Sequence, residues 1–277
     1  MLRKIGSSLF SHTVLLLLSM VFIIPFVWLV LTSLKPEAQV FTDPLQWIPR
    51  PFQWSNYRDA LTHPSFPFFR LLGNTLFYAG GSTIGVVYSS ALVAYGFSRI
   101  KFWGRDTLFL VTIATMLLPA AVTLIPRYIL FFNLGWVGTY APLIVPYFLG
   151  NAFNIFLLRQ FMLTVPWELS DAARIDGANE FVIFSKIILP MVRPALIVVA
   201  ILHFMYTWND FFEPLIYLND PKQYTLVLGL YAFQTNRARI VWSLMMAAAV
   251  TVTGPLIGLF FAAQRYFVDG ISLTGNK

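Results

Sequence analysis

The segment Thr13–Leu34, TVLLLLSMVFIIPFVWLVLTSL, holds 22 consecutive residues without a charged side chain. An α-helix rises about 1.5 Å per residue, so about 20 apolar residues cross the hydrocarbon layer of a bilayer. The run is longer than the apolar core of a cleaved export signal, and no small-x-small cleavage site follows it. The sequence therefore predicts a retained membrane-spanning helix at 13–34.

The composition of the whole chain is also strongly apolar and poor in charged residues. Of its 277 residues, 58% are hydrophobic and 11% are charged, whereas about a quarter of an ordinary soluble domain is charged. The net charge of +7 does not indicate a nucleic-acid partner, because the basic residues are scattered and no five of them are consecutive. The absence of cysteine excludes disulfides and thiolate metal sites. We expect one all-α, polytopic membrane domain over residues 1–277.

Apolar runs, uncharged apart from Arg159, Asp210 and Glu213, divide the chain into six predicted spans. The run 128–158 is too long for one straight helix, and its glycines and prolines predict a half-helix or loop near 128–140. The segment 35–70, which carries six prolines, is expected to be an ordered but non-helical extracytoplasmic cover. The inner loop 160–193 and the outer connector 219–239 separate the later spans. The predicted spans are 13–34, 71–98, 107–126, 141–159, 194–218 and 240–264.

Basic residues fix the expected orientation of these spans. Arg99, Lys101 and Arg105 lie within seven residues between the second and third spans. Loops of this kind stay on the cytoplasmic side of a membrane. Both termini and the loop 160–193 are therefore expected to be cytoplasmic.

Two glycine pairs have the spacing that lets helices approach closely in lipid. They are Gly81 with Gly85 and Gly254 with Gly258. Each pair predicts a contact between two helices of the same chain, and a dimer interface is the alternative.

The loop 160–193 lies within RQFMLTVPWELSDAARIDGANEFVIFSKIILPMVR, which runs from Arg159 to Arg193. It has the pattern of two short helices. Pro166 fits the first turn of the first helix, Thr164 is a possible cap, and Gly177 permits the turn that ends it. Asn179 or Gly177 opens the second helix, and Pro190 closes or kinks it.

The first of these helices has a face suited to docking. Glu168, Asp171 and Ile175 recur at spacings of three and four residues, so they share one face. Two alanines, Ala172 and Ala173, keep the helix slim, and a slim helix with two acids can enter a cleft of a partner. The alternative is a pair of surface helices that lie on the membrane with solvated charges.

A longer motif runs through the same loop. Asp171-Ala172-Ala173, Gly177 and Ile187-Ile188-Leu189-Pro190 fit the pattern E-A-A, three residues, Gly, nine residues, I-x-L-P. This stretch resembles the EAA loop of the membrane subunits of ABC importers. The stretches 32–36, TSLKP, and 208–211, WNDF, are similar to those of the carbohydrate-uptake, maltose-type permeases. Asp171 stands where that family usually has Glu, which keeps the charge but shortens its reach by one methylene.

The resemblance implies a permease subunit in the inner membrane of a prokaryote, which imports a sugar or oligosaccharide. It also implies a second homologous permease subunit in a heterodimer, two ATPase subunits that hold ATP and Mg²⁺, and an extracytoplasmic sugar-binding protein that the segment 219–239 reaches. This chain has no G-x-x-x-x-G-K-[ST] phosphate loop, so we expect no ATP site, no directly bound cofactor and no enzyme activity of its own. The residues that the resemblance assigns to ATPase coupling are Glu168, Asp171, Ala172, Ala173, Asp176, Gly177 and Ala178.

Polar residues within the spans are candidates for the substrate pathway, because ionisable groups are costly in lipid. His203, Tyr206, Asp210 and Glu213 lie near one stripe of the expected fifth span, with Asn209 beside it. Such a stripe offers a sugar both hydrogen-bonding groups and aromatic rings. The alternative places the two acids at the outer interface and makes His203 a satisfied buried histidine. Further candidates, which also fit helix-to-helix contacts, are Asn74, Tyr78, Asn151 and Asn154.

Two other classes of function remain as alternatives. An ion-coupled secondary carrier usually has inverted repeats and carboxylates near the middle of the membrane, and neither is evident here. An intramembrane enzyme is more remote, since the sequence contains neither H-E-x-x-H nor G-x-S-x-G. No catalytic residue and no metal site are therefore predicted.

Overall fold

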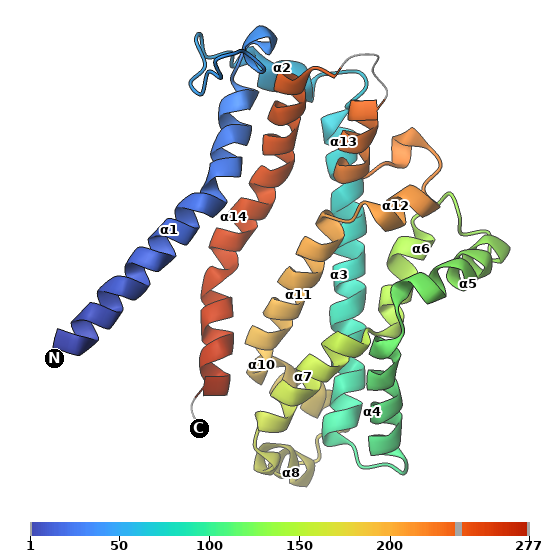
Figure 1. Cartoon of the computed structure of the whole chain (residues 1–277). Coiled ribbons are helices and arrows are strands. Elements are labelled where there is room, and N and C mark those ends of the chain that lie inside the picture. Colours follow the sequence, from blue (N-terminus) through green and yellow to red (C-terminus); the bar gives the residue numbers. More distant parts are fainter. Residues whose placement is uncertain (1, 236–239, 276–277) are drawn as a thin grey trace. The chain divides into compact units, whose positions relative to one another are not determined.

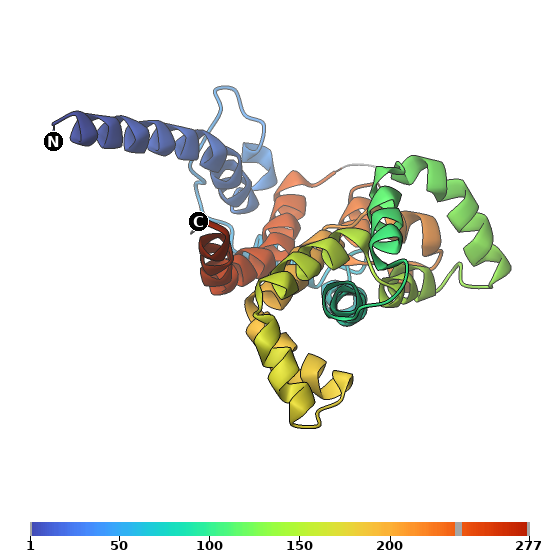
Figure 2. The same ribbon diagram turned by 90° about the horizontal axis from the view of Figure 1, so that it is seen from below.

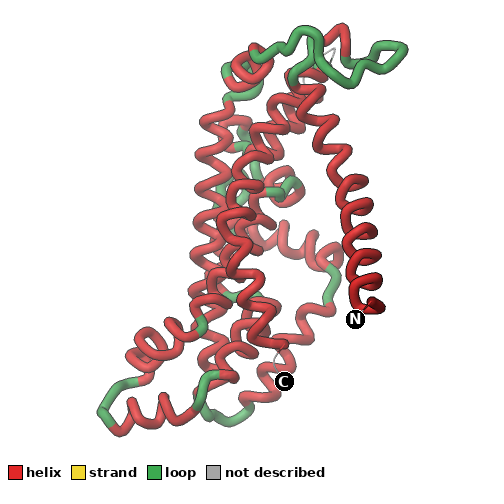
Figure 3. Tube along the Cα trace, turned by 90° about the vertical axis from the view of Figure 1, so that its left-hand side faces the viewer, coloured by secondary structure: helices red, strands yellow, loops and turns green. Residues whose placement is uncertain are grey.

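The computed structural model describes residues 2–235 and 240–275, and within these ranges it contains helices and loops but no strand (Figure 3). The all-α expectation is confirmed for this part of the chain. The chain divides into two compact units, Met1–Phe69 with Gly229–Ile257 and Arg70–Leu228 with Gly258–Lys277.

The first unit is built on two long apolar helices, α1 (Leu2–Ser33) and the first part of α14 (Trp242–Gly275). Between them along the chain lie η1 (Glu37–Gln39) and α2 (Ser55–Leu61), and α13 (Leu226–Thr235) ends in this unit. The expectation of a non-helical cover at 35–70 is therefore wrong for α2. The prolines of this segment lie before residue 52 and after residue 63, which leaves 55–61 free to form a helix.

Glu37 holds the start of α14. One carboxylate oxygen accepts the backbone N–H of Trp242 at 3.0 Å, and the other accepts the N–H of Ser243 at 2.9 Å and its hydroxyl at 2.8 Å. The first N–H groups of a helix have no partner within the helix. Glu37 therefore caps α14 from a distant part of the sequence.

A buried lysine lies close to this cap in sequence. Lys35 is 0% exposed, and its Nζ lies 4.1 Å from the centroid of the Trp28 ring. Burial lowers the pKa of the Lys35 amine, because desolvation disfavours its charged form. Asn56 donates to the carbonyls of Ser33 and Lys35, both at 2.9 Å, so α2 is tied to the end of α1.

The second unit is arranged along α3 (Phe68–Arg99). Two helices, α7 (Ala152–Thr164) and α11 (Arg193–Trp208), lie beside the inner half of α3 (Figure 1). A buried core there combines Ala94 and Tyr95 of α3 with Leu158 and Met162 of α7 and Val199 of α11. The other elements of this unit are α4 (Arg105–Ala114), η2 (Thr115–Leu117), α5 (Ala120–Asn133), α6 (Ala141–Ile144), η3 (Val145–Leu149), α8 (Trp167–Ile175), α9 (Glu180–Val182), η4 (Ile183–Ile188), α10 (Leu189–Met191), α12 (Phe212–Tyr217) and η5 (Pro221–Gln223).

Within residues 2–235 and 240–275, four helices are long and apolar enough to cross a membrane, and the number rises to six if each of two bent helix pairs is one span. The four are Phe10–Ser33, Phe68–Arg99, Ala141–Thr164 and Trp242–Gln264. The bent pairs are Arg105–Leu117 with Ala120–Asn133, at 99°, and Glu180–Met191 with Arg193–Trp208, at 77°. The expected span 107–126 is thus broken near Pro119, which has no N–H to continue a helix.

The chain between α12 and α14, expected at 219–239 to be an outer loop that reaches the binding protein or, as the alternative, a simple connector, is partly helical. It contains η5 and the apolar helix α13, while residues 236–239 lie outside the described part. Asn74 donates to the carbonyls of Lys222 and Tyr224 at 2.8 and 2.9 Å, which fixes this segment against α3.

One of the two glycine pairs forms a close contact inside the second unit. A Cβ at Gly81 would lie 3.3 Å from the Ile144 side chain, and one at Gly85 would lie 2.6 Å from the Phe148 ring. The predicted contact within the chain is confirmed for this pair. Gly254 and Gly258 have no such neighbour within 4 Å among the described residues.

Candidate functional site

The candidate coupling helix is α8, which follows α7 after a two-residue break. Pro166 has φ −55° and ψ 139° and occupies the position before the first helical residue, with no side-chain cap. Thr164 is the last residue of α7. The suggested Thr164 cap is therefore wrong, because α7 extends through that residue. In Figure 2, α8 projects away from α3 and α11.

The docking face expected on α8 is exposed. Glu168, Asp171 and Ile175 all lie on the solvent side, and Ile175 is 87% exposed. Ser170 and Ala173 are buried on the opposite side. The shared face follows the spacing in the sequence, and it presents two acids around an apolar residue. Exposed neighbours on the same side include Ala172 and Asp176, whereas Ala178 is half-buried.

The turn after α8 depends on Gly177. Its φ is +83°, a conformation that residues with a Cβ rarely adopt. The N–H of Gly177 donates to Arg174 at 3.0 Å, and the N–H of Ala178 donates to Ala173 at 2.9 Å. Asn179 then caps α9, since its side chain accepts the N–H of Val182 at 2.9 Å. Gly177 as the stop and Asn179 as the start are both confirmed.

The apolar end of the motif is an anchor in the core. Ile183 and Ile188 of η4 are 0% exposed, and Phe184 is 4% exposed. They pack with α3, α7 and α11 in the buried cluster of the second unit. Pro190 lies in α10, next to the 77° bend that leads into α11. The motif thus joins an exposed helix to a buried attachment.

Charged side chains connect the two helices of the loop. Arg174 bonds Asp171 at 2.8 Å and Glu180 at 2.9 Å. Bonds to Glu180 first, and then to Asp171, raise the pKa of the Arg174 guanidinium. Glu180 also accepts the hydroxyl of Tyr95 in α3. Arg174 and Tyr95 are not among the site residues predicted from the sequence. The available signal for Arg174 is its spacing of three residues from Asp171 on the expected helix.

Arg99, at the end of α3, is 1% exposed. Its guanidinium donates to the carbonyls of Met162 and Val165, and it lies 3.5 Å from the carbonyl of Pro166. The guanidinium carbon is 4.8 Å from the Trp167 ring centroid, a cation–π distance. This burial differs from the sequence-based expectation, in which Arg99 is one of the charges that flank the membrane. A hollow of about 650 Å³ adjoins these groups, lined by Arg99, Ile100, Lys101, Arg105, Trp167, Asp171, Arg174 and Glu180.

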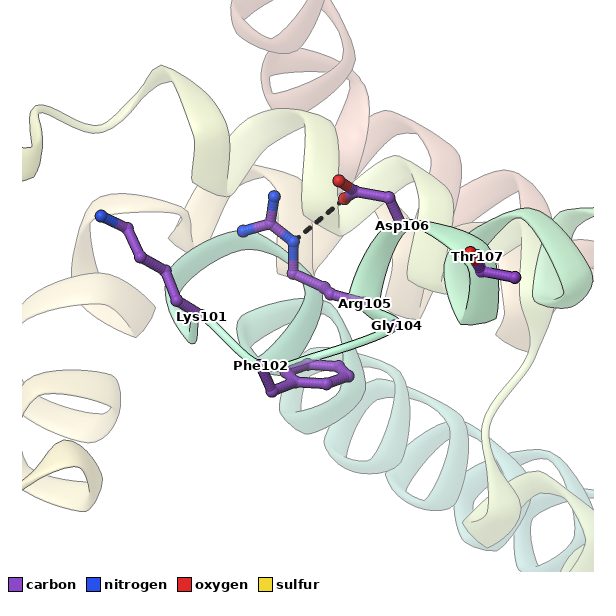
Figure 4. Close-up of a pocket in the computed structure, with 6 residues that line it drawn as sticks. All are labelled: Lys101, Phe102, Gly104, Arg105, Asp106 and Thr107. Carbon is purple, nitrogen blue, oxygen red and sulfur yellow. Dashed lines mark hydrogen bonds and ion pairs between the residues drawn. The ribbon is translucent and has the colours of Figure 1, made fainter.

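The inner loop between α3 and α4 forms a second, shallower hollow of about 400 Å³ (Figure 4). Arg105 Nε bonds Asp106 Oδ1 at 3.0 Å, while Lys101 extends to the other side of the loop. Gly104, with φ +78°, immediately precedes the first residue of α4. Two cations and one acid thus meet at this turn.

The predicted stripe of pathway residues is interrupted. α11 ends at Trp208, so Asp210 lies in the break and Glu213 in α12. His203 is 7% exposed and its ring centroid is 4.5 Å from that of Tyr147, whereas Tyr206 is 60% exposed. The expectation that the four residues share one helical face is wrong, because the helix does not continue through the polar WND sequence.

Both acids of this region have partners. Asp210 accepts the hydroxyl of Tyr78 at 2.7 Å and the N–H of Glu213 at 3.2 Å. Glu213 forms an ion pair with Arg127 of α5. The structure brings Tyr78 and Asp210 together from α3 and the α11–α12 break, a pairing that spacing alone does not reveal.

The candidate asparagines bond mainly to the backbone. Asn151 caps α7 by accepting the N–H of Asn154 at 3.2 Å, and Asn154 is 8% exposed. Asn209 donates to the carbonyl of Met205 at 2.8 Å. The bonds of Asn74 join α3 to another segment, as the helix-to-helix alternative predicts, whereas Asn151 and Asn209 bond at the ends of their own helices. The described residues contain no group of three or more His, Asp or Glu placed to bind a metal ion.

The sequence matches a known protein family. The family model described as "Binding-protein-dependent transport system inner membrane component" matches residues 81–273. A probable ABC transporter permease protein of Pyrococcus horikoshii is 32% identical over 269 residues, with 97% of each chain covered. The arabinooligosaccharides transport system permease protein AraQ of Bacillus subtilis is 29% identical over 264 residues, which cover 95% of this chain and 93% of AraQ. The sn-glycerol-3-phosphate transport system permease protein UgpE of Yersinia enterocolitica is 30% identical over 271 residues, 96% of each chain.

Solved structures share the fold. A chain of a bacterial ABC transporter involved in the import of the acidic polysaccharide alginate superposes with a TM-score of 0.84 at 22% identity, covering 96% of this chain and 97% of its own. A chain of a bacterial alginate ABC transporter in complex with an alginate pentasaccharide-bound periplasmic protein gives 0.68 at 15% identity, with 94% of each covered. With the match over residues 81–273, this chain belongs to the family of binding-protein-dependent transport system inner membrane components.

Proposed function

We propose that this chain is the membrane-spanning subunit of an ATP-driven, binding-protein-dependent importer of a sugar or oligosaccharide. The observation that carries the proposal is α8, an exposed helix with Glu168 and Asp171 on its outer face and a buried attachment through Ile188. An exposed helix that carries two acids and is anchored in the core offers a partner protein a fixed docking surface. We assign that partner as an ATPase subunit, which holds ATP and Mg²⁺.

The substrate class is inferred from the relatives. AraQ and UgpE are named for the transport of arabinooligosaccharides and sn-glycerol-3-phosphate, and they match 95% and 96% of this chain. Both names describe polyhydroxylated solutes. A sugar, an oligosaccharide or a related polyol phosphate is the class that fits.

The proposed assembly follows from the same family membership. It contains this chain, a second homologous permease subunit, two ATPase subunits and an extracytoplasmic binding protein. Six spans with both termini in the cytoplasm place α8 and the basic loop 99–105 on the ATPase side. Tyr206, which is 60% exposed, and Asn209, which is also exposed, are the pathway candidates that we propose to contact the solute.

The coupling role has a specific geometric basis. The turn at Gly177 is exposed, and a Cβ built there would meet nothing within 4 Å among the residues that the structure describes. A larger side chain at 177 would therefore project into the surface that the ATPase is proposed to cover. Asp171 has its carboxylate bonded to Arg174, and its side chain is still 63% exposed, so it can contact a partner as well.

The test begins with purification through a tag on this chain, followed by reconstitution of the complex in proteoliposomes. A thermal-shift screen of the binding protein encoded with the system identifies the sugar. Uptake of that labelled sugar should require ATP and both ATPase subunits, and Gly177→Leu should reduce uptake while the complex still assembles in the membrane. Uptake without ATPase subunits, driven by an ion gradient, would contradict the proposal and favour a secondary carrier.

A further inference from the structure

The inner end of α3 contacts the start of α8, the candidate coupling helix, and also the segment that follows the end of α8. Arg99 and Tyr95 are four residues apart, so they lie on one face of α3, a single turn from each other. Arg99 reaches the start of α8 through Pro166 and Trp167. Tyr95 reaches the segment just after α8 through Glu180.

The contact at the far end of α8 is a continuous chain of polar groups. Asp171 bonds Arg174 at 2.8 Å, Arg174 bonds Glu180 at 2.9 Å, and Glu180 accepts the hydroxyl of Tyr95. These four residues cross the Gly177 turn and end in the buried core of the second unit, since Tyr95 is 4% exposed. Hydrogen bonds between charged partners are among the stronger ones in proteins. We call this set the α8–α3 strut.

Arg99 supplies a second, independent attachment. It binds carbonyl groups at the end of α7, where a helix leaves its last carbonyls without intrahelical partners. Its guanidinium also lies against the ring of Trp167, the first residue of α8. The start of α8 is therefore fixed to the same turn of α3 as its end.

We infer that α8 and the inner end of α3 move as one body, with Tyr95 and Glu180 as positioning residues that pass displacement of α8 directly to α3. A helix held at one end can pivot, whereas one held at both ends by a single turn of another helix cannot tilt without moving that helix. The inference rests on the proposed function and adds the path by which an ATPase would move a particular span.

The test uses a reporter in α3 of the assembled complex. The chain has no cysteine, so Leu76→Cys, at a position that is 48% exposed on α3, can carry the sole maleimide fluorophore in this subunit. The partner subunits are used in cysteine-free form. The probe is MgATP with vanadate, and the readouts are the fluorescence change of the label and the rate of ATP hydrolysis without vanadate.

Tyr95→Phe removes the hydroxyl that joins α3 to Glu180 and leaves the ring in place. We expect the complex to assemble and hydrolyse ATP, while the ATP-dependent fluorescence change at residue 76 falls about tenfold. Glu180→Ala removes the carboxylate that accepts the Tyr95 hydroxyl, from a side chain that is 45% exposed, and it should give at least the same loss. Tyr88→Phe is the matched control, because Tyr88 lies on α3 and is 57% exposed.

A double-mutant cycle separates transmission from simple packing. Tyr95→Phe and Glu180→Ala together should be no worse than Glu180→Ala alone, whereas Tyr88→Phe should leave the effect of Glu180→Ala unchanged. If the ATP-dependent change in Tyr95→Phe equals that in Tyr88→Phe, the strut is overturned and the proposed function is not. A loss in Tyr95→Phe that Glu180→Ala fails to reproduce overturns the strut in the same way. A wild-type complex that shows no ATP response overturns the proposed function as well.

Discussion

The cap that Glu37 places on α14 gives a prediction with a magnitude that follows from its contacts. Glu37→Ala removes the acceptor for two backbone N–H groups and one hydroxyl. Loss of a helix cap costs about 0.5–2 kcal/mol, and loss of a negative charge at a helix N-terminus adds about 0.3–1 kcal/mol. We expect Glu37→Ala to destabilise the start of α14 by about 2 kcal/mol. Glu37→Gln keeps one acceptor oxygen and should cost about half as much.

Hydrogen–deuterium exchange of the purified protein in lipid nanodiscs measures this effect locally. In a peptide spanning the start of α14, about 1 kcal/mol accelerates exchange about fivefold and 2 kcal/mol about thirtyfold, if the opening of the helix limits exchange. Asp59→Asn is the control, because Asp59 is an exposed acid of α2 in the same unit. Unchanged exchange in Glu37→Ala, or equal acceleration in Asp59→Asn, would refute the capping role.

Three further substitutions test the second unit. Gly177→Ala places a Cβ on backbone at φ +83° and should lower stability by about 1 kcal/mol, whereas Gly177→Asn, a residue that tolerates this conformation, should cost less in the same thermal melt. Gly85→Ala brings a Cβ to 2.6 Å from a ring of η3 and should cost about 1–3 kcal/mol, while Gly80→Ala, with nothing within 4 Å, should not; equal melting temperatures would exclude the close contact. Arg127→Met leaves the carboxylate of Glu213 unpaired and should cost about 1–3 kcal/mol, and adding Glu213→Gln should recover part of the loss in a double-mutant cycle.

Local signals in the sequence predicted the loop around α8 well. The positive φ of Gly177 and the cap by Asn179 both depend on residues whose chemistry restricts the backbone in their immediate neighbourhood. The exposed face with Glu168 and Asp171 follows from helical periodicity, which is also local. Such features do not depend on how the rest of the chain folds.

Contacts between distant segments could not be predicted in the same way. Tyr78 with Asp210, Arg127 with Glu213, and Tyr95 with Glu180 join residues about 80 to 130 positions apart. No periodicity encodes such a pairing, because it depends on which helices become neighbours. The predicted stripe on the fifth span failed for a related reason. An uncharged run indicates where a helix can cross a membrane, but it does not show where polar residues and neighbouring helices end that helix.

Arg99 holds its neighbours through carbonyl oxygens of the main chain, at Met162, Val165 and Pro166. Every amino acid has a main-chain carbonyl, so this attachment restricts the residue type at position 99 but not at the positions that accept its hydrogen bonds. The side chains at 162 and 165 are free to vary with the packing around them, while the arginine has no substitute that presents the same set of donors. Substitutions at 162 and 165 can therefore repack the buried core of the second unit without removing the oxygen atoms that hold Arg99.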